Sequence, residues 1–121
     1  EDWREKNLRY WPWYGRGYVQ ITWEDNYERL GKRLGLDLTS DPDVVMDPEI
    51  AVKILVTGMV EGLFTGKKLS DYISLSASGF VNARRIINGM DKARLIAGYA
   101  GQYDEALREE LKYGVDKCQR T

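Results

Sequence analysis

The sequence contains no histidine and a single cysteine, Cys118, and both shortages exclude particular kinds of site. Without histidine there is no Ser-His-Asp relay, no Cys-His pair and no histidine ligand for a metal. One cysteine excludes a disulfide within the chain, and its position near the C-terminus favours a surface or packing role. Acid–base chemistry therefore depends on carboxylates, and we expect no metal and no other cofactor.

The sequence also lacks a long apolar run and an excess of charge of either sign. Eighteen basic and nineteen acidic residues give a formal net charge of −1, so neither nucleic acid nor an anionic membrane is an expected partner. No apolar stretch approaches the roughly 20 residues that span a bilayer. A length of 121 residues, with 43% hydrophobic residues, predicts one domain over residues 1–121.

The segment 22–34 predicts an amphipathic helix. Thr22 is a suitable N-cap, with Asp25 three residues later, and Gly35 is a natural stop. Its apolar residues recur at helical spacing, at Trp23, Tyr27, Leu30 and Leu34.

Further helices are predicted along the rest of the chain. Asp41-Pro42 and Asp47-Pro48 each place a capping residue before a proline, which predicts two helix starts, the first of them very short. The remaining helical segments are a central buried helix at 49–64, a turn in 69–73, a short helix at 80–87 ended by Asn88-Gly89, and a long helix at about 91–113 with apolar residues near one side. The fold class is therefore all-α, with a short irregular hairpin near 14–21 as its only extended structure.

The segment YWPWYGRGYVQITW, residues 10–23, gathers three tryptophans and three tyrosines around turn-forming residues. Pro12, Gly15 and Gly17 interrupt helical periodicity and place these rings on a loop. Aromatic faces pack against the C–H faces of sugars, so such a loop suits a saccharide cleft. The alternative is that the rings form the core.

Three neutral polar residues follow at a spacing that allows them to converge. If Gln20 is extended, Thr22 shares its side, and Asn26 lies one helical turn after Thr22. Such a group could hold a water molecule or a sugar hydroxyl. The alternative is that Thr22 only caps the helix and Asn26 faces solvent.

The order of three motifs resembles glycoside hydrolase family 19. These motifs are WYGRGYVQITWEDNY, LGLDLTSDPDVVMDPEIA and VNARRIING, and the resemblance extends from Arg9 to about Leu107. The family contains chitinases and the muramidase-like endolysins of phages and prophages. YGRGYVQ and the short connection to DPEIA are more similar to the phage-type lysozymes. The resemblance implies a lysozyme-like fold and hydrolysis of β-1,4-glycosidic bonds, in peptidoglycan rather than chitin, by an inverting mechanism.

The resemblance also implies roles for individual residues. Thr22 matches the position that helps to hold the attacking water, and Asn26 matches an asparagine that binds water or the acetamido group of the sugar. These two are the expected catalytic residues. The localisation implied is that of a phage or prophage protein made in the bacterial cytoplasm and acting on the cell wall.

Substrate-binding roles are implied for four more positions. Tyr14 and Gln20 match residues that line the cleft, and Asn88 matches a residue of its second wall. Arg94 matches an arginine that pairs with catalytic carboxylates, and Asp91 lies near an acidic partner of that arginine. The expected partner is a polysaccharide.

The general acid of the family is missing from this sequence. It is the glutamate of a His-Glu-Thr type motif that precedes the YGRG segment, and nothing before Tyr14 matches it. Glu1, Asp2 and Glu5 are weak substitutes, with helix solvation as their ordinary role, and Glu24 and Asp25 are favoured in a first helical turn by the macrodipole alone.

Three hypotheses follow from this missing acid. The chain is the C-terminal part of a hydrolase with little or no activity alone, a non-catalytic glycan-binding module, or an interaction or inhibitory protein that reuses the scaffold. Because a domain without its N-terminal helix would expose apolar surface, we also expect self-association or a partner segment.

Overall fold

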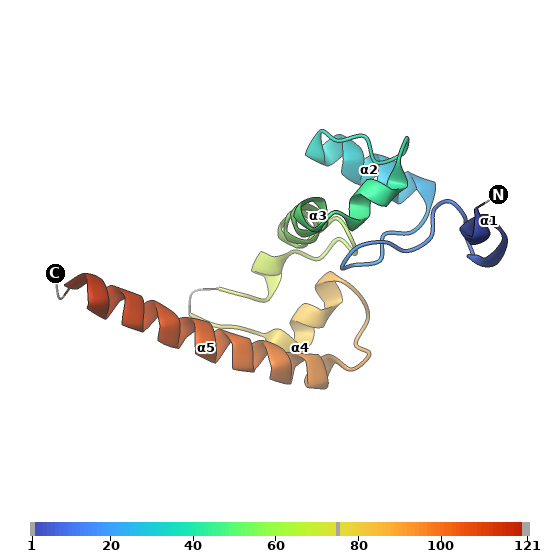
Figure 1. Cartoon of the computed structure of the whole chain (residues 1–121). Coiled ribbons are helices and arrows are strands. Elements are labelled where there is room, and N and C mark those ends of the chain that lie inside the picture. Colours follow the sequence, from blue (N-terminus) through green and yellow to red (C-terminus); the bar gives the residue numbers. More distant parts are fainter. Residues whose placement is uncertain (1, 75, 120–121) are drawn as a thin grey trace.

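The computed structural model of the chain describes residues 2–74 and 76–119, with side chains as far as Lys112. The elements follow the order α1 (Trp3–Asn7), α2 (Glu24–Leu34), η1 (Pro42–Met46), α3 (Pro48–Glu61), η2 (Leu69–Asp71), α4 (Phe80–Ala83), η3 (Arg84–Ile86) and α5 (Ala93–Gln119) (Figure 1). In the described ranges, extended pairing is limited to two antiparallel bridges, Arg16 with Ile21 and Ile73 with Ser78. The all-α prediction is confirmed, and the hairpin expected near 14–21 is a turn closed by one bridge.

Helix α3 lies at the centre of the fold, between α2 and the pair formed by α4 and α5 (Figure 1). The main core is formed where α2, η1 and α3 meet, because each contributes apolar side chains to it. Its buried members are Ile21, Tyr27, Leu30, Leu38, Val45 and Ile54. Trp13 and Val19 of the aromatic loop pack against this core.

Local capping signals correctly predicted the starts of η1 and α3 and the end of α2. Asp47 accepts hydrogen bonds from the backbone N–H groups of Glu49 and Ile50, and Pro48 follows at the first helical position. Gly35 ends α2 with a φ of 69°, in the left-handed region where glycine has no steric cost. The two helix starts predicted at Asp41-Pro42 and Asp47-Pro48, and this stop, are confirmed.

The N-cap predicted for α2 is wrong. Trp23, not Thr22, occupies the cap position, with a φ of 75° and no side-chain cap. The Trp23 N–H donates to the carbonyl of Trp13 at 3.0 Å, so the chain enters the helix directly from the aromatic loop. The Thr22 hydroxyl points back instead and donates to the Gln20 carbonyl at 3.0 Å.

Helix α5 is longer than predicted and leaves its apolar side uncovered. It begins at Ala93, and its C-terminal half extends past the other elements (Figure 1). Large apolar side chains spaced four residues apart remain more than half exposed, namely Leu95, Tyr99, Tyr103, Leu107 and Leu111.

Residues 80–87 form α4 and η3 in succession rather than one continuous helix. Among the described residues, no helix is both long and apolar enough to cross a bilayer. Glu1 and the side chain of Cys118 lie outside what the structure describes.

Candidate functional site

Arg16 is the organising side chain of the aromatic loop. Only 2% of this residue is exposed, although it is charged. Its Nε donates to Asp43 Oδ1 at 3.0 Å, and one terminal nitrogen donates to the carbonyl of Pro12 at 2.7 Å and to the hydroxyl of Tyr27 at 3.0 Å. The guanidinium also lies 3.7 Å from the centre of the Tyr14 ring. Paired in this way, a buried charge avoids the cost of isolation.

A second arginine joins the same network from α1. Arg4 donates to the Tyr14 hydroxyl at 2.7 Å and to Asp43 at 2.9 Å. Burial alone would raise the pKa of the Asp43 carboxyl, but the hydrogen bonds from Arg4 and Arg16 outweigh it and hold that pKa below the ordinary 3.8. Three separate segments are thereby joined at one carboxylate.

Three of the six rings of the loop, those of Trp11, Trp13 and Tyr14, are partly buried, whereas Tyr10, Tyr18 and Trp23 are exposed. Trp13 packs against Tyr27 with 5.3 Å between ring centres, and Trp11 stacks on Tyr14 at 6.0 Å. Tyr27 is fully buried, and burial raises the pKa of its hydroxyl above the ordinary 10.0 despite the hydrogen bond from Arg16. These rings hold the loop in shape, as the core alternative expected.

A cleft of about 190 Å³ lies beside this loop, at the start of α2. Gln20, Thr22 and Asn26 all line it, next to the exposed ring of Trp23. Its remaining lining residues are Val19, Ile21, Arg29, Leu30, Phe64 and Ile87. The cleft therefore combines apolar walls with neutral amide and hydroxyl groups, the composition typical of a small-ligand site.

Each of the three polar side chains keeps spare hydrogen-bonding capacity. The Thr22 hydroxyl uses its hydrogen on the Gln20 carbonyl, so its oxygen can still accept. Asn26 donates one amide hydrogen to the Thr22 carbonyl at 2.8 Å and accepts from Arg29 at 3.2 Å, which leaves its second amide hydrogen. Gln20 donates to the Gly17 carbonyl at 3.0 Å, and its amide oxygen can still accept.

The other predicted site residues do not line this cleft. Tyr14 turns towards Arg4 and Arg16, where its hydroxyl is engaged. Asn88 is exposed one residue beyond the cleft-lining Ile87, and its side-chain oxygen accepts from the N–H of Gly89. Asn88 therefore lies just after the C-cap of η3, Ile87, which is the last residue of this segment to line the cleft.

Two residues at the start of the last helix also lie apart from the cleft lining. Arg94 is exposed in the first turn of α5. Asp91 is exposed, and its backbone carbonyl accepts from Arg84 at 3.1 Å. The roles implied for these residues stay predictions.

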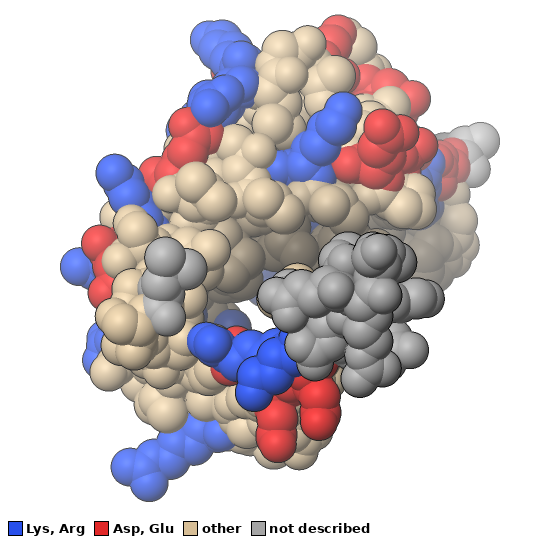
Figure 2. Space-filling model, turned by 90° about the vertical axis from the view of Figure 1, so that its left-hand side faces the viewer, with Lys and Arg blue, Asp and Glu red and all other residues tan. Residues whose placement is uncertain are grey.

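The carboxylates near the loop are either engaged by a structural partner or exposed. Asp2 caps α1, and hydrogen bonds from Arg4 lower the pKa of its carboxyl below 3.8. Glu5, Glu24 and Asp25 are exposed in first helical turns, as helix solvation predicts. Within the described residues there is no cluster of acidic and cysteine side chains suited to a metal. Lys, Arg, Asp and Glu side chains are interspersed over the face seen in Figure 2.

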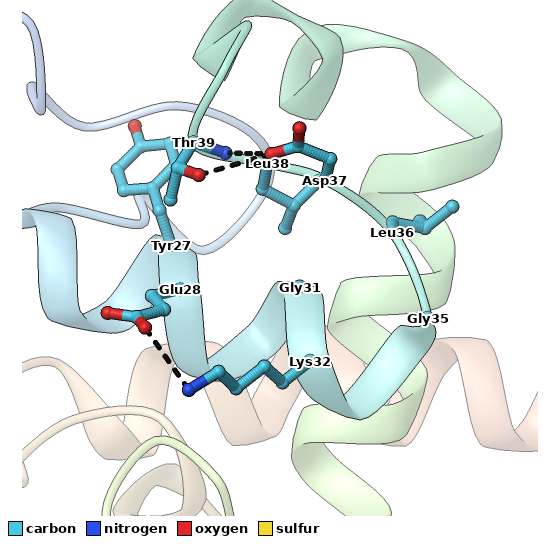
Figure 3. A pocket seen from close by; sticks show the side chains of 9 residues that line it. All are labelled: Tyr27, Glu28, Gly31, Lys32, Gly35, Leu36, Asp37, Leu38 and Thr39. Atoms are coloured by element: carbon cyan, nitrogen blue, oxygen red, sulfur yellow. Dashed lines mark hydrogen bonds and ion pairs between the residues drawn. The ribbon is translucent and has the colours of Figure 1, made fainter.

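A larger hollow of about 480 Å³ lies between α2 and the loop that follows it (Figure 3). Its rim carries the ion pair between Lys32 and Glu28 at 3.1 Å, and Asp37 accepts from the backbone and hydroxyl of Thr39. Hydrogen bonds from Ser40 and then Thr39 lower the pKa of Asp37 to about 2. These bonds hold the Asp37 carboxylate within its own turn.

Sequence comparison relates the chain to enzymes that hydrolyse glycosidic bonds. The family described as chitinase class I, glycoside hydrolase family 19, matches residues 2–60. Chitinase 5 of Oryza sativa subsp. japonica is 42% identical over 126 aligned positions, which cover 98% of this chain and 38% of the relative. An endochitinase of Arabidopsis thaliana is 40% identical over 109 positions, covering 89% of this chain and 33% of the relative. The chain belongs to glycoside hydrolase family 19, as its motifs predicted.

The chain spans less than two fifths of the length of these curated relatives, at 38% and 33%. No solved structure matches it.

The sequence did not reveal Asp43 as the partner of Arg16, or Arg29 and Phe64 as cleft residues. The sequence marked Arg16 by its position between two glycines, Gly15 and Gly17. Asp43 was visible only as a first-turn residue after Pro42, which gave no sign of its long-range partner.

Proposed function

We propose that this chain forms the glycan-binding wall of an inverting β-1,4-glycoside hydrolase whose substrate contains N-acetylated sugars. One observation carries the proposal: Gln20, Thr22 and Asn26 line a single cleft beside the exposed ring of Trp23. A flat ring binds the C–H face of a sugar, and neutral polar groups bind its hydroxyl and amide edges.

In this proposal Thr22 and Asn26 position the attacking water. The Thr22 oxygen accepts one hydrogen of the water, because its own hydrogen is donated to the Gln20 carbonyl. The free amide hydrogen of Asn26 donates to the water oxygen, while its other hydrogen is donated to the Thr22 carbonyl. The second hydrogen of the water is then left for a base carboxylate, and a lone pair is directed at the sugar carbon.

The general acid comes from outside these 121 residues in this proposal. The sequence holds no His-Glu-Thr type segment, and Asp2, one of the weak acidic substitutes, forms an ion pair with Arg4 at 2.8 Å. An inverting enzyme needs a protonated carboxyl on the opposite side of the scissile bond from the water. The 121-residue chain alone would therefore bind glycan and turn it over slowly or not at all.

The two substrate candidates share N-acetylglucosamine in β-1,4 linkage. The YGRGYVQ segment favours peptidoglycan, and the relatives, which are named as chitinases, favour chitin. Acting on peptidoglycan, the protein would be an endolysin-type muramidase of a phage or prophage, made in the bacterial cytoplasm and acting on the cell wall.

Zymography on purified peptidoglycan and on chitin tests the proposal. The chain would be compared with a form extended at its N-terminus by a His-Glu-Thr type segment, and with the extended form carrying Asn26→Ala. We expect clearing by the extended form, little by the chain alone, and loss of clearing with Asn26→Ala. An extended form that binds glycan without hydrolysing it supports a binding module instead. Tryptophan fluorescence that is unchanged at millimolar oligosaccharide supports the interaction protein.

A further inference from the structure

The ring of Trp23 has a different environment from the other rings of the aromatic loop. It remains 55% exposed and lines the cleft, whereas Trp13 and Tyr14 pack internally, and Tyr18, although 63% exposed, does not line the cleft. Tyr10 lies against it with 4.3 Å between ring centres and an interplanar angle of 48°. Tyr10 thus supports the indole while leaving more than half of it open.

The backbone of Trp23 is held in a conformation that side chains rarely adopt. Its φ of 75° and ψ of 139° lie in a region populated almost only by glycine. Three backbone hydrogen bonds keep it there: its N–H donates to Trp13, and its carbonyl accepts from Asn26 and Tyr27. A glycine would fit this position with less strain, so the backbone conformation does not require an indole.

The surroundings of the indole match a sugar better than an apolar ligand. Gln20, Asn26 and Arg29 lie in the same cleft and present amide and guanidinium groups around the ring. An apolar ligand would leave these polar groups without partners, whereas the hydroxyl groups of a sugar would satisfy them.

We infer that Trp23, backed by Tyr10, is a stacking platform for one pyranose ring of the glycan, next to the sites proposed for Thr22 and Asn26. This inference rests on the proposed function and adds a further sugar-binding position to the same cleft. The C–H face of the sugar packs on the exposed indole face, and its hydroxyl groups bind Asn26, Gln20 or Arg29.

Isothermal titration calorimetry with the hexamer of N-acetylglucosamine and with a muropeptide tests this platform. Trp23→Gly removes the ring and relieves the backbone strain, so we expect binding weakened about tenfold with a melting temperature equal to or above that of the wild type. A ring required only for folding would instead lower the melting temperature. Trp23→Tyr keeps a flat ring and should bind within about threefold of the wild type.

Two further variants complete the design. Tyr10→Ala removes the supporting ring without changing Trp23 and should weaken binding by a smaller factor. Trp3→Ala is the matched control, because Trp3 is 67% exposed on α1 and does not line the cleft.

The outcomes separate the platform from the proposed function. If Trp23→Gly binds as tightly as the wild type while Asn26→Ala loses binding, the platform is wrong and the cleft stands. If the wild-type chain binds neither ligand, both proposals are overturned. If Trp3→Ala weakens binding as much as Trp23→Gly, the loss is not specific to the platform and the inference fails.

Discussion

Arg16 and Asp43 lie 27 positions apart in the sequence, yet the Arg16 Nε donates to a carboxylate oxygen of Asp43 at 3.0 Å. The arginine is 1% exposed in its side chain and the aspartate 42%, so the pair extends from the interior to the surface. It fixes the aromatic loop to η1. The shape of the loop, and with it the cleft, depends on this pair.

Replacing Arg16 with methionine should destabilise the protein by about 3 kcal/mol, because the Tyr27 hydroxyl and the Pro12 carbonyl lose their donor. Urea unfolding followed by circular dichroism measures the change. Arg108→Met is the control, since Arg108 forms an exposed pair with Asp104 on α5 and should change stability by no more than about 0.5 kcal/mol. Equal effects of the two substitutions would contradict a central role for Arg16.

Acid should destabilise the fold through Asp43 and Asp37. Both carboxyls have folded-state pKa values below the ordinary 3.8, about 2 for Asp37, so the folded protein binds these protons less tightly than the unfolded chain does. Their contribution is complete above about pH 5 and is lost as the pH falls through the lowered pKa values. Unfolding free energies measured from pH 7 to pH 2 should therefore decline below about pH 4.

Asp43→Asn provides the comparison for this pH dependence. The variant should be less stable than the wild type at pH 7 and should lose less stability on acidification. An unchanged slope below pH 4 would exclude Asp43 as a source of the effect.

Gly58 allows Phe64 to reach the wall of the cleft. A Cβ at position 58 would overlap with the Phe64 ring, so Gly58→Ala should force that ring to move and destabilise the protein by about 1–3 kcal/mol. Because Phe64 lines the cleft, binding of oligosaccharide should weaken as well. Gly98→Ala is the control: a Cβ there meets nothing within 4 Å, and the helix should gain about 0.5–1 kcal/mol. Thermal unfolding of both variants measures these two changes in stability, and a Gly58→Ala variant as stable as the wild type would contradict the prediction.

In an extended, active form, Thr22→Val or Asn26→Ala should lower turnover well over tenfold. Each removes a hydrogen-bonding group that holds the water in the proposed mechanism. Initial rates on a soluble chitooligosaccharide, with KM measured separately, test the expectation. Unchanged turnover in both variants would remove these residues from the site.

The 121-residue chain alone should self-associate through α5. This tendency should be lost when a preceding segment covers the helix. Leu95, Tyr99, Tyr103 and Leu107 are each more than half exposed, and water-exposed apolar area favours association by about 25 cal/mol per Å² when it is buried. Sedimentation velocity at increasing concentration measures it.

Two variants make this test specific. Leu107→Glu should shift the population towards monomer, whereas Gln102→Glu, an exposed charge change on the same helix, should not. A wild-type chain that stays strictly monomeric at high concentration contradicts the expectation.

The parts of the fold that local chemistry determines were predictable from the sequence. Asp47 with Pro48, and Gly35 at the end of α2, act within one helical turn, and the structure agrees with both. Thr22 was mispredicted as a cap because the backbone at Trp23 is held by Trp13, a contact outside the helix. Periodicity predicted the apolar side of α5, but it does not determine whether another element covers that side.

The candidate site also contains a part that local sequence predicts and a part that only tertiary packing brings together. Gln20, Thr22 and Asn26 lie within seven positions of each other in the sequence, so a local argument was enough to bring them together in one cleft. Phe64 and Ile87 enter the same cleft from distant segments, and only the packing of α3 and η3 brings them there. Asn88 lies one position after Ile87 and outside the cleft lining, its side-chain oxygen accepts from the Gly89 N–H, and its predicted role stays a prediction.

The convergence of Arg4 and Arg16 on Asp43 means that the aromatic loop is not a transplantable peptide. A synthetic copy of residues 10–27 would lack the carboxylate that neutralises its buried guanidinium and the α1 arginine that holds Tyr14. Grafting the loop onto another scaffold would require that scaffold to supply an anion at the same distance. Recombination between relatives would therefore have to exchange α1, the loop and η1 together.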